Sequence, residues 1–237
     1  MLIGEREKLF ERRLVALHAV EALDDDPWTA GPATSAPRFD LLGEGGGIVM
    51  PGRSRGRPGE AHATGLFGSE GRGLAEGLDG RENVITVRTC GKALGCEGAL
   101  ICGAQAIVDF LINRGRGFIF STAPSPLMAA AVRAALGIVR ANGILRKQLH
   151  ELMAFAAERL QPLGASFHGS QILPLIIGDS GETMKVAGLL QQAGFDVRGI
   201  RPPTVPEGTS RLRISVTLNI DRAAIAALSN AIRELQR

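Results

Sequence analysis

A lysine set between glycines is the residue of this chain best suited to covalent chemistry. Residues 89–95 read TCGKALG, so Lys92 directly follows Gly91 and precedes Gly95 by three residues. Glycines let a backbone or a small molecule approach closely. An amine on an apolar, tightly turned support loses solvation, which lowers its pKa from about 10.4 toward the range in which the free amine attacks a carbonyl. The heptad therefore indicates Schiff-base chemistry at Lys92, with an ordinary surface lysine in a loop as the alternative.

The elements around this heptad place Lys92 just past a strand end. Residues 83–88 read NVITVR and are rich in β-branched side chains, which predicts a strand. Further strands and helices then alternate, as strand 99–103, helix 104–113, strand 117–121 and helix 126–141. This alternation predicts an α/β layer, in which helices cover a sheet.

The C-terminal part of the chain follows a different pattern. Helices are expected at 144–160, 181–192 and 221–236, and strands at 172–177, 195–200 and 211–218. Such a pattern is typical of an α+β domain whose sheet is covered on one face. The boundary is expected near residue 142, so we divide the ordered chain into 59–142 and 143–237.

The N-terminal part is expected to be only partly ordered. Residues 1–26 are predicted to hold a helix, because apolar residues recur at helical spacing between 5 and 23. Residues 27–58 are crowded with Gly, Pro and Arg and show no sustained period, which predicts a disordered linker. Within it, residues 55–58 resemble the core of an AT-hook, whose arginines enter the minor groove of DNA. A nucleic-acid binder that uses Arg53, Arg55 and Arg57 is therefore one alternative function.

Charge and cysteine usage argue against several classes of protein. The formal net charge of +3 is spread along the chain, which does not suggest a dedicated nucleic-acid partner. Cys90, Cys96 and Cys102 have no C-x-x-C spacing, so we expect neither a disulfide framework nor a metal site. No apolar run approaches membrane-spanning length, and the N-terminus lacks the apolar core of a signal peptide. We expect a cytoplasmic protein without a membrane partner.

Several segments together identify a family. They read EAHATG at 60–65, TCGKALG at 89–95, FSTA at 120–123, RPPT at 201–204 and GTSRLR at 208–213. In this combination they resemble the 8-amino-7-oxononanoate synthases, which are pyridoxal-phosphate enzymes of the α-oxoamine synthase group with the aspartate-aminotransferase fold. The resemblance runs from Glu60 to the end of the chain. It implies a partial large domain with a mostly parallel sheet and helices, followed by an α+β small domain.

The resemblance also implies an activity and a role for each site residue. The activity is an acyl transfer in biotin biosynthesis, in which L-alanine condenses with a pimeloyl thioester and carbon dioxide is lost. Lys92 would bond to pyridoxal 5'-phosphate and then act as the base on the alanine Cα proton. His62 would hydrogen-bond the phenolic oxygen of the cofactor, and Thr89 would contact its phosphate. Arg201 would clamp the substrate carboxylate, and Thr204 would line the same pocket. An ordinary turn histidine and a surface-paired arginine are the alternatives for His62 and Arg201.

Two departures from the family lower the expected activity. The family has an aspartate that pairs with the pyridinium nitrogen where this chain has Gly59. Losing a hydrogen bond to a charged group costs about 1.5 to 3 kcal/mol, or roughly one to two powers of ten in rate. In addition, residues 27–58 stand where the family has most of its large domain, so apolar faces and sheet edges are expected to be exposed. We expect poor solubility of the single chain, or a homodimer or larger assembly.

Besides nucleic-acid binding, three alternatives in function stay open. The chain is either an active 8-amino-7-oxononanoate synthase, a relative with another amino acid and acyl thioester, or an inactive remnant that serves as an oligomerisation or binding module. Turnover of alanine with a pimeloyl thioester separates the first from the third. A comparison of glycine with alanine separates the first from the second.

Overall fold

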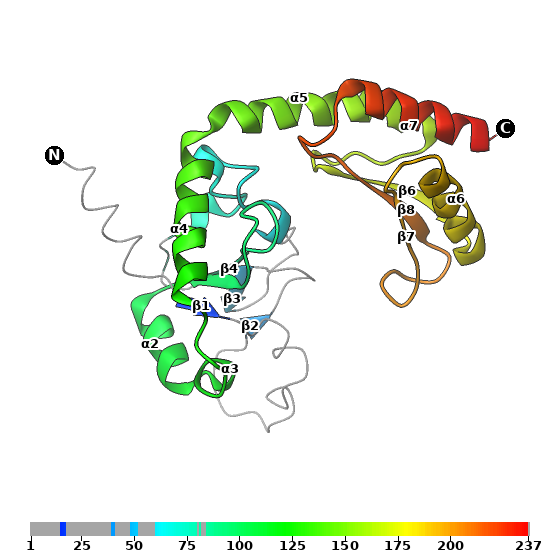
Figure 1. The fold of residues 1–237 in the computed structure, drawn as a ribbon. Helices are drawn as coiled ribbons and strands as arrows, with labels where there is room; N and C mark the ends of the chain where they lie inside the picture. Colours follow the sequence, from blue (N-terminus) through cyan, green and yellow to red (C-terminus); the bar gives the residue numbers. More distant parts are fainter. Residues whose placement is uncertain are drawn as a thin grey trace. The chain divides into compact units, whose positions relative to one another are not determined.

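The computed structural model describes residues 15–17, 39–40, 48–51, 60–79, 81 and 84–236, in two compact units. The first unit spans Met1–Gly143 and the second spans Ile144–Arg237. Each unit has its own sheet and its own helices (Figure 1).

A five-stranded antiparallel sheet lies at the centre of the first unit. Its strands follow the order β1-β5-β4-β3-β2. They comprise β1 (Val15–Leu17), β5 (Ala99–Cys102), β4 (Ile85–Thr89), β3 (Ile48–Pro51) and β2 (Phe39–Asp40). The resemblance implied a mostly parallel sheet, and this part of the expectation is corrected for the described strands. Strands β4 and β5 are joined by residues 90–98, which are too few for the crossover of a dozen or more residues that a parallel pair requires.

Helices cover both faces of the pair β4 and β5. The helices of this unit comprise η3 (Glu60–His62), η4 (Ser69–Gly71), η5 (Glu76–Leu78), α2 (Gln105–Arg114), α3 (Arg116–Ile119) and α4 (Pro126–Ala141). On one face, Val87 and Ile101 pack with Leu111 of α2 and Phe118 of α3. On the other face, Leu100 packs with Val132 of α4. This arrangement of helices on a sheet agrees with the α/β class that the sequence predicts.

Helix α4 begins and ends where its sequence signals predict. The Ser125 hydroxyl accepts a hydrogen bond from the Leu127 amide at 3.3 Å, and proline occupies the first helical position. At the other end, the Asn142 side chain donates to the Ile138 carbonyl at 2.9 Å. In Figure 1 the helix stands beside the turns of residues 60–79, with which it is in contact through η4.

Three expectations for the first unit are corrected. Of the helix expected in residues 1–26, the structure describes only Val15–Leu17, which form strand β1 paired with β5. Of the linker expected at 27–58, residues 39–40 and 48–51 form strands β2 and β3, and the AT-hook-like residues 55–58 lie outside the described residues. The strand expected at 117–121 is instead occupied by helix α3 and the residues after it. Short apolar runs do not distinguish strand from helix by periodicity, and pairing with distant strands overrides local propensity.

The second unit is a three-stranded antiparallel sheet with helices. Strand β8 (Ser210–Ser215) lies between β6 (Ile172–Gly178) and β7 (Arg198–Ile200). The helices comprise α5 (Gly143–Leu160), η6 (Gln161–Leu163), α6 (Ser180–Gln192) and α7 (Arg222–Leu235). Alternate residues of β8 are buried, and its Leu212 is fully buried, as are Leu173, Leu190 and Ile232. The α+β pattern of strands and helices follows the sequence expectation closely.

Among the described residues, no single helix is long and apolar enough to cross a membrane. One bent pair of helices, Pro126–Ala141 with Gly143–Leu163, is long and apolar enough to do so by length and composition only.

Candidate functional site

Lys92 lies in a closed loop that is anchored at its base. The Cys90 amide donates to the Gly98 carbonyl at 2.8 Å, and the Cys96 amide donates to the Cys90 carbonyl at 2.9 Å. Cys90 and Leu94 are buried against α4, whereas Lys92 itself is exposed. The loop is therefore fixed by buried neighbours on both sides of Lys92, which is itself an exposed residue.

The turn that carries His62 lies against this loop. His62 is half-buried in η3, between the buried Ala61 and Ala63. The Thr89 hydroxyl donates to the Ala61 carbonyl at 3.5 Å, which is a long hydrogen bond. A Cβ atom placed on Gly65 would lie 2.8 Å from the Cβ of Ala93. The two segments that carry His62 and Lys92 are thus packed together although they are far apart in the sequence.

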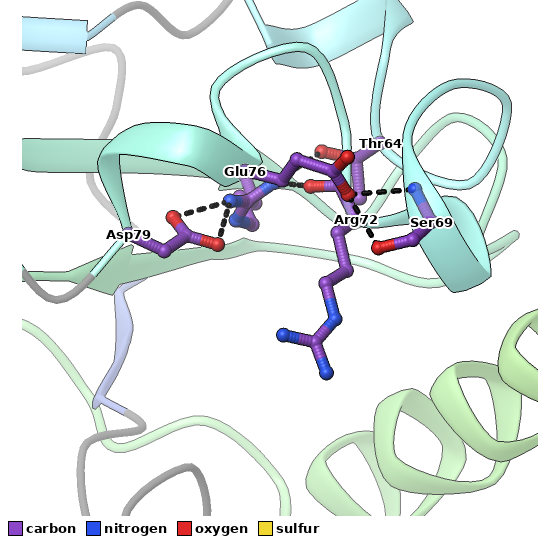
Figure 2. Close-up of polar contacts among 6 residues, drawn as sticks. Thr64, Ser69, Arg72, Glu76 and Asp79 are labelled. Carbon is purple, nitrogen blue, oxygen red and sulfur yellow. Dashed lines mark hydrogen bonds and ion pairs between the residues drawn. The ribbon is translucent and has the colours of Figure 1, made fainter.

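A buried arginine ties the same turn to strand β4. Arg88 is 6% exposed and donates to both carboxylate oxygens of Asp79, at 2.9 and 3.1 Å. Its other terminal nitrogen donates to the Thr64 hydroxyl at 3.5 Å and to the backbone carbonyl of Arg72. Figure 2 shows the Asp79 carboxylate directed into this network, while the Arg72 side chain extends away from it. One guanidinium therefore joins three separate turns within residues 60–79.

A second carboxylate closes the turn around Ser69. The Glu76 carboxylate accepts hydrogen bonds from the Ser69 amide at 2.6 Å and from the Ser69 hydroxyl at 2.7 Å (Figure 2). These donors, the hydroxyl first, hold the pKa of Glu76 below its ordinary value of 4.5. The neighbouring Glu70 pairs with Arg140 of α4 at 3.7 Å. The turn is fixed both internally and to α4.

The three cysteines of the chain lie close to the Lys92 loop as free thiols. Burial, and to a lesser degree the nearby thiols of Cys96 and Cys102, raises the pKa of Cys90 to about 11. Burial also raises the pKa of Cys102, against which the charge of Arg88 acts. Within the described residues, no group of three or more His, Cys, Asp or Glu side chains is arranged to hold a metal ion.

Arg201 and Thr204 belong to the second unit. Both follow β7 in an exposed turn, in which the Thr204 amide donates to the Arg201 carbonyl at 3.1 Å. The structure thus brings the segments that carry His62, Thr89 and Lys92 into contact in the first unit, and places Arg201 and Thr204 in one turn of the second. Gly59 lies outside the described residues.

Sequence reasoning missed Arg88 and its acceptors Thr64 and Asp79. A signal was present, because Arg88 directly follows the β-branched residues 84–87 and still lies within the expected strand 83–88. An arginine at an inward-facing strand position must find acceptors, since an unpaired buried charge is costly.

The comparisons with known proteins settle the family of the chain. The family model for aminotransferase class I and II matches residues 59–232. The chain belongs to this family. The family is pyridoxal-phosphate-dependent, and the relatives and structural neighbours are enzymes. The expected cofactor class is therefore confirmed at the level of the family.

Curated relatives carry the name that the resemblance implies. The chain is 44% identical over 162 residues to the putative 8-amino-7-oxononanoate synthase of Geobacillus kaustophilus, covering 67% of this chain and 42% of that protein. It is 36% identical over 241 residues to the 8-amino-7-oxononanoate synthase of Geotalea daltonii, covering 100% of this chain and 58% of that protein. The resemblance to this group is confirmed. The chain spans about half the length of the curated relatives it matches.

Solved structures confirm the fold class. The 8-amino-7-oxononanoate synthase of Francisella tularensis matches with a TM-score of 0.64 and 24% identity, over 75% of this chain and 53% of that one. A serine palmitoyltransferase of Sphingomonas wittichii matches with a TM-score of 0.66 and 23% identity, over 74% of this chain and 45% of that one. At these identities the likeness concerns the fold alone.

The described residues suit pyridoxal phosphate in the chemistry of their donors. Lys92 provides an amine for an aldehyde, His62 an imidazole for a phenolic oxygen, and Thr89 a hydroxyl for a phosphate. A Cβ atom on Gly95 would meet nothing within 4 Å, so the loop is open at that residue. The sequence has no carboxylate for the pyridinium nitrogen at Gly59.

Proposed function

We propose that this chain is a pyridoxal-phosphate-dependent acyltransferase of the 8-amino-7-oxononanoate synthase type, cytoplasmic and homodimeric. The reaction joins the acyl group of a pimeloyl thioester to the Cα of L-alanine, and releases carbon dioxide and the free thiol. The observation that carries the proposal is the contact between the His62 turn and the Lys92 loop, made through Thr89 with Ala61 and through Gly65 with Ala93.

Each site residue has a proposed role that its position supports. Lys92 would hold the cofactor through its amine and, once the amine of alanine has displaced it there, would accept the Cα proton of alanine. Backbone hydrogen bonds anchor the loop that carries Lys92. His62 donates to the phenolic oxygen. Thr89 contacts the phosphate once its hydroxyl proton turns from the Ala61 carbonyl, and the 3.5 Å length of that bond makes the turn inexpensive. When bound, pyridoxal phosphate supplies an electron sink for the charge left on Cα.

In the second unit, Arg201 is proposed to bind the substrate carboxylate and Thr204 to contact the same substrate. The exposed guanidinium of Arg201 offers a planar fork of donors that matches a carboxylate. Thr204 is held three residues away by its amide bond to the Arg201 carbonyl.

Reductive trapping tests the proposed function directly. The protein is mixed with pyridoxal phosphate, reduced with borohydride and mapped by peptide mass spectrometry. We expect the label on Lys92, and its loss in Lys92→Ala. Lys185→Ala is the matched control, because Lys185 is an exposed lysine paired with Glu182 at 3.3 Å and should leave the label unchanged. Equal labelling of all lysines would contradict a cofactor site at Lys92.

Turnover separates the candidate activities once Lys92 is labelled. Release of carbon dioxide and of free thiol is measured with L-alanine and a pimeloyl thioester, and then with glycine and with other acyl thioesters. Faster turnover with L-alanine and the pimeloyl thioester supports the proposed substrates. Preference for another pair would assign the chain to a sister activity of the same group.

A second candidate function is an oligomerisation module without catalysis. Large apolar side chains of the first unit are exposed, among them Leu127 at 77%, Phe120 at 76% and Ile138 at 59%. Apolar surface of this kind marks protein contacts when it is contiguous. Sizing chromatography over a range of concentrations tests this candidate. A monomer at high concentration would remove both this module and the proposed homodimer.

A further inference from the structure

We propose that Arg88 is a positioning residue that fixes the His62 turn on strand β4 and thereby sets how His62 stands toward Lys92. The relevance of this positioning to catalysis rests on the proposed function. The contacts themselves are independent of that function.

The last two residues of β4 hold the turn on either side of His62. Thr89 hydrogen-bonds the carbonyl of Ala61, one residue before His62. Arg88 donates a long hydrogen bond of 3.5 Å to the hydroxyl of Thr64, two residues after it, and reaches the same segment more closely through Asp79 at 2.9 Å. Lys92 follows in the loop that starts at the same strand end. Arg88 and Thr89 therefore connect the turn of His62 to the strand end from which the Lys92 loop begins.

The segment that carries His62 has little apolar packing of its own. Its buried residues are small, consisting of Ala61, Ala63, Thr64, Gly65, Gly71, Gly73 and Ala75. Small side chains bury little apolar surface, and stabilisation by burial scales with that surface. Backbone hydrogen bonds close the segment internally, from Gly65 to the Gly71 carbonyl and from Gly73 to the Phe67 carbonyl, each at 2.8 Å. Apolar contacts such as that of Ala75 with Val84 are small, so polar contacts from outside the segment add to them in fixing it to the sheet.

Within the part of the chain that the structure describes, Arg88 makes several of these polar contacts. A guanidinium is a planar fork of five donors, so it fixes the directions of several acceptors at once. Here the acceptors belong to three turns, through Thr64, the Arg72 carbonyl and Asp79. The Asp79 carboxylate compensates the buried charge with two hydrogen bonds, and its own side chain is 33% exposed. The Arg88–Asp79 pair therefore serves mainly to orient the turns, because buried ion pairs contribute little net stability compared with apolar packing.

The test compares Arg88→Met and Arg88→Lys with a matched control, all in the full chain. Arg133→Met is the control, because Arg133 is an exposed arginine on α4 of the same unit. The first readout is amide hydrogen exchange, which needs no cofactor. In Arg88→Met we expect the amides of Gly65 and Gly73 to exchange faster by about tenfold or more. The strand pairs β4–β5 and β6–β8 should keep their rates. Arg88→Lys should fall between the two, because an ammonium keeps the charge and loses the fork.

The second readout separates positioning from a general loss of structure. The pH dependence of borohydride labelling of Lys92 by pyridoxal phosphate is measured in each variant. We expect its midpoint to shift in Arg88→Met and to stay in place in Arg133→Met. Unchanged exchange at Gly65 and Gly73 would overturn the inference, as would equal acceleration in β4–β5. Faster amide exchange at Gly65 and Gly73 together with an unchanged pH dependence of Lys92 labelling would also overturn the inference. Failure to label Lys92 in the unaltered protein would instead refute the proposed function, and the exchange rates alone would then decide the role of Arg88.

Discussion

Gly65 lies directly against Ala93, so closely that a Cβ atom on Gly65 would stand 2.8 Å from the Cβ of Ala93. Real Cβ atoms do not approach side chains at this distance without a shift of one partner. Gly65 also has a φ of +89°, a backbone conformation that favours glycine. The contact joins the turn that carries His62 to the loop that carries Lys92. Its removal is therefore expected to affect both fold and site.

Gly65→Ala is expected to destabilise the first unit by about 1 to 3 kcal/mol from backbone strain, with a further cost from the clash. The matched control is Gly194→Ala, because Gly194 has a similar positive φ of 91° and an added Cβ would meet nothing there. Denaturant unfolding of both variants measures the difference, which isolates the contact with Ala93. Adding Ala93→Gly to the first variant should recover part of the loss. No difference between the two single variants would show that the contact is unimportant.

The thiol of Cys90 is expected to resist alkylation in the folded protein. Its pKa is raised to about 11 and it is 1% exposed, whereas Cys96 is half-buried. At pH 8 the reactive thiolate of Cys90 is about one part in a thousand. Iodoacetamide should modify Cys96 first and Cys90 only after denaturant is added, as peptide mapping over time would show. Labelling of Cys90 at the rate of Cys96 would contradict the burial.

The raised pKa of Cys90 also predicts a loss of stability at high pH. The thiol ionises at about 9 in the unfolded chain and at about 11 in the fold. Its contribution is therefore fully present below pH 9 and declines as the pH rises toward 11. Urea unfolding at pH 8 and pH 10.5, compared between the unaltered protein and Cys90→Ala, checks the sign. The pH-dependent loss should be smaller in Cys90→Ala.

Glu76 is expected to make the Ser69 turn sensitive to acid. Its pKa lies below the ordinary 4.5, so its contribution is present above that value and is lost as the pH falls through the lowered pKa. Exchange of the Ser69 amide should accelerate in that acidic range beyond the intrinsic effect of pH. Glu76→Gln should remove this pH dependence, whereas Glu158→Gln, at an exposed position of α5, should preserve it. The same acid response in both variants would assign it to other groups.

Asp221 is expected to stabilise the C-terminal helix through its N-cap. Its carboxylate accepts a hydrogen bond from the Ala224 amide at 2.8 Å. Asp221→Ala should cost about 1 kcal/mol of stability. Asp196→Ala removes an equally acidic residue of the same unit, whose pairing with Arg198 is largely exposed and contributes about 0 to 1 kcal/mol. Thermal unfolding of the full chain compares the two, and a larger effect at Asp196 would contradict the capping role.

The sequence alone predicted the elements whose signals are local. The helix expected at 126–141 occupies those residues, because proline at its start, an asparagine after its end and apolar periodicity all act within a few turns. The strand before Lys92 and the strands and helices of the second unit were predicted within a few residues for the same reason. The motif around Lys92 pointed to the chemistry, since residue type and glycine flanks do not depend on distant parts of the chain.

The tertiary structure decided which distant segments meet. Arg88 bonds Thr64 across 24 residues, and Thr89 bonds Ala61 across 28. Neither contact follows from propensity or period, because it exists only after chain closure has brought the turns onto the strand. The same holds for the pairing of Val15–Leu17 with β5, which replaced an expected helix. Local sequence thus predicted the candidate reactive group and most of its supporting elements, and only the folded contacts decided what holds the His62 turn against the segment of Lys92.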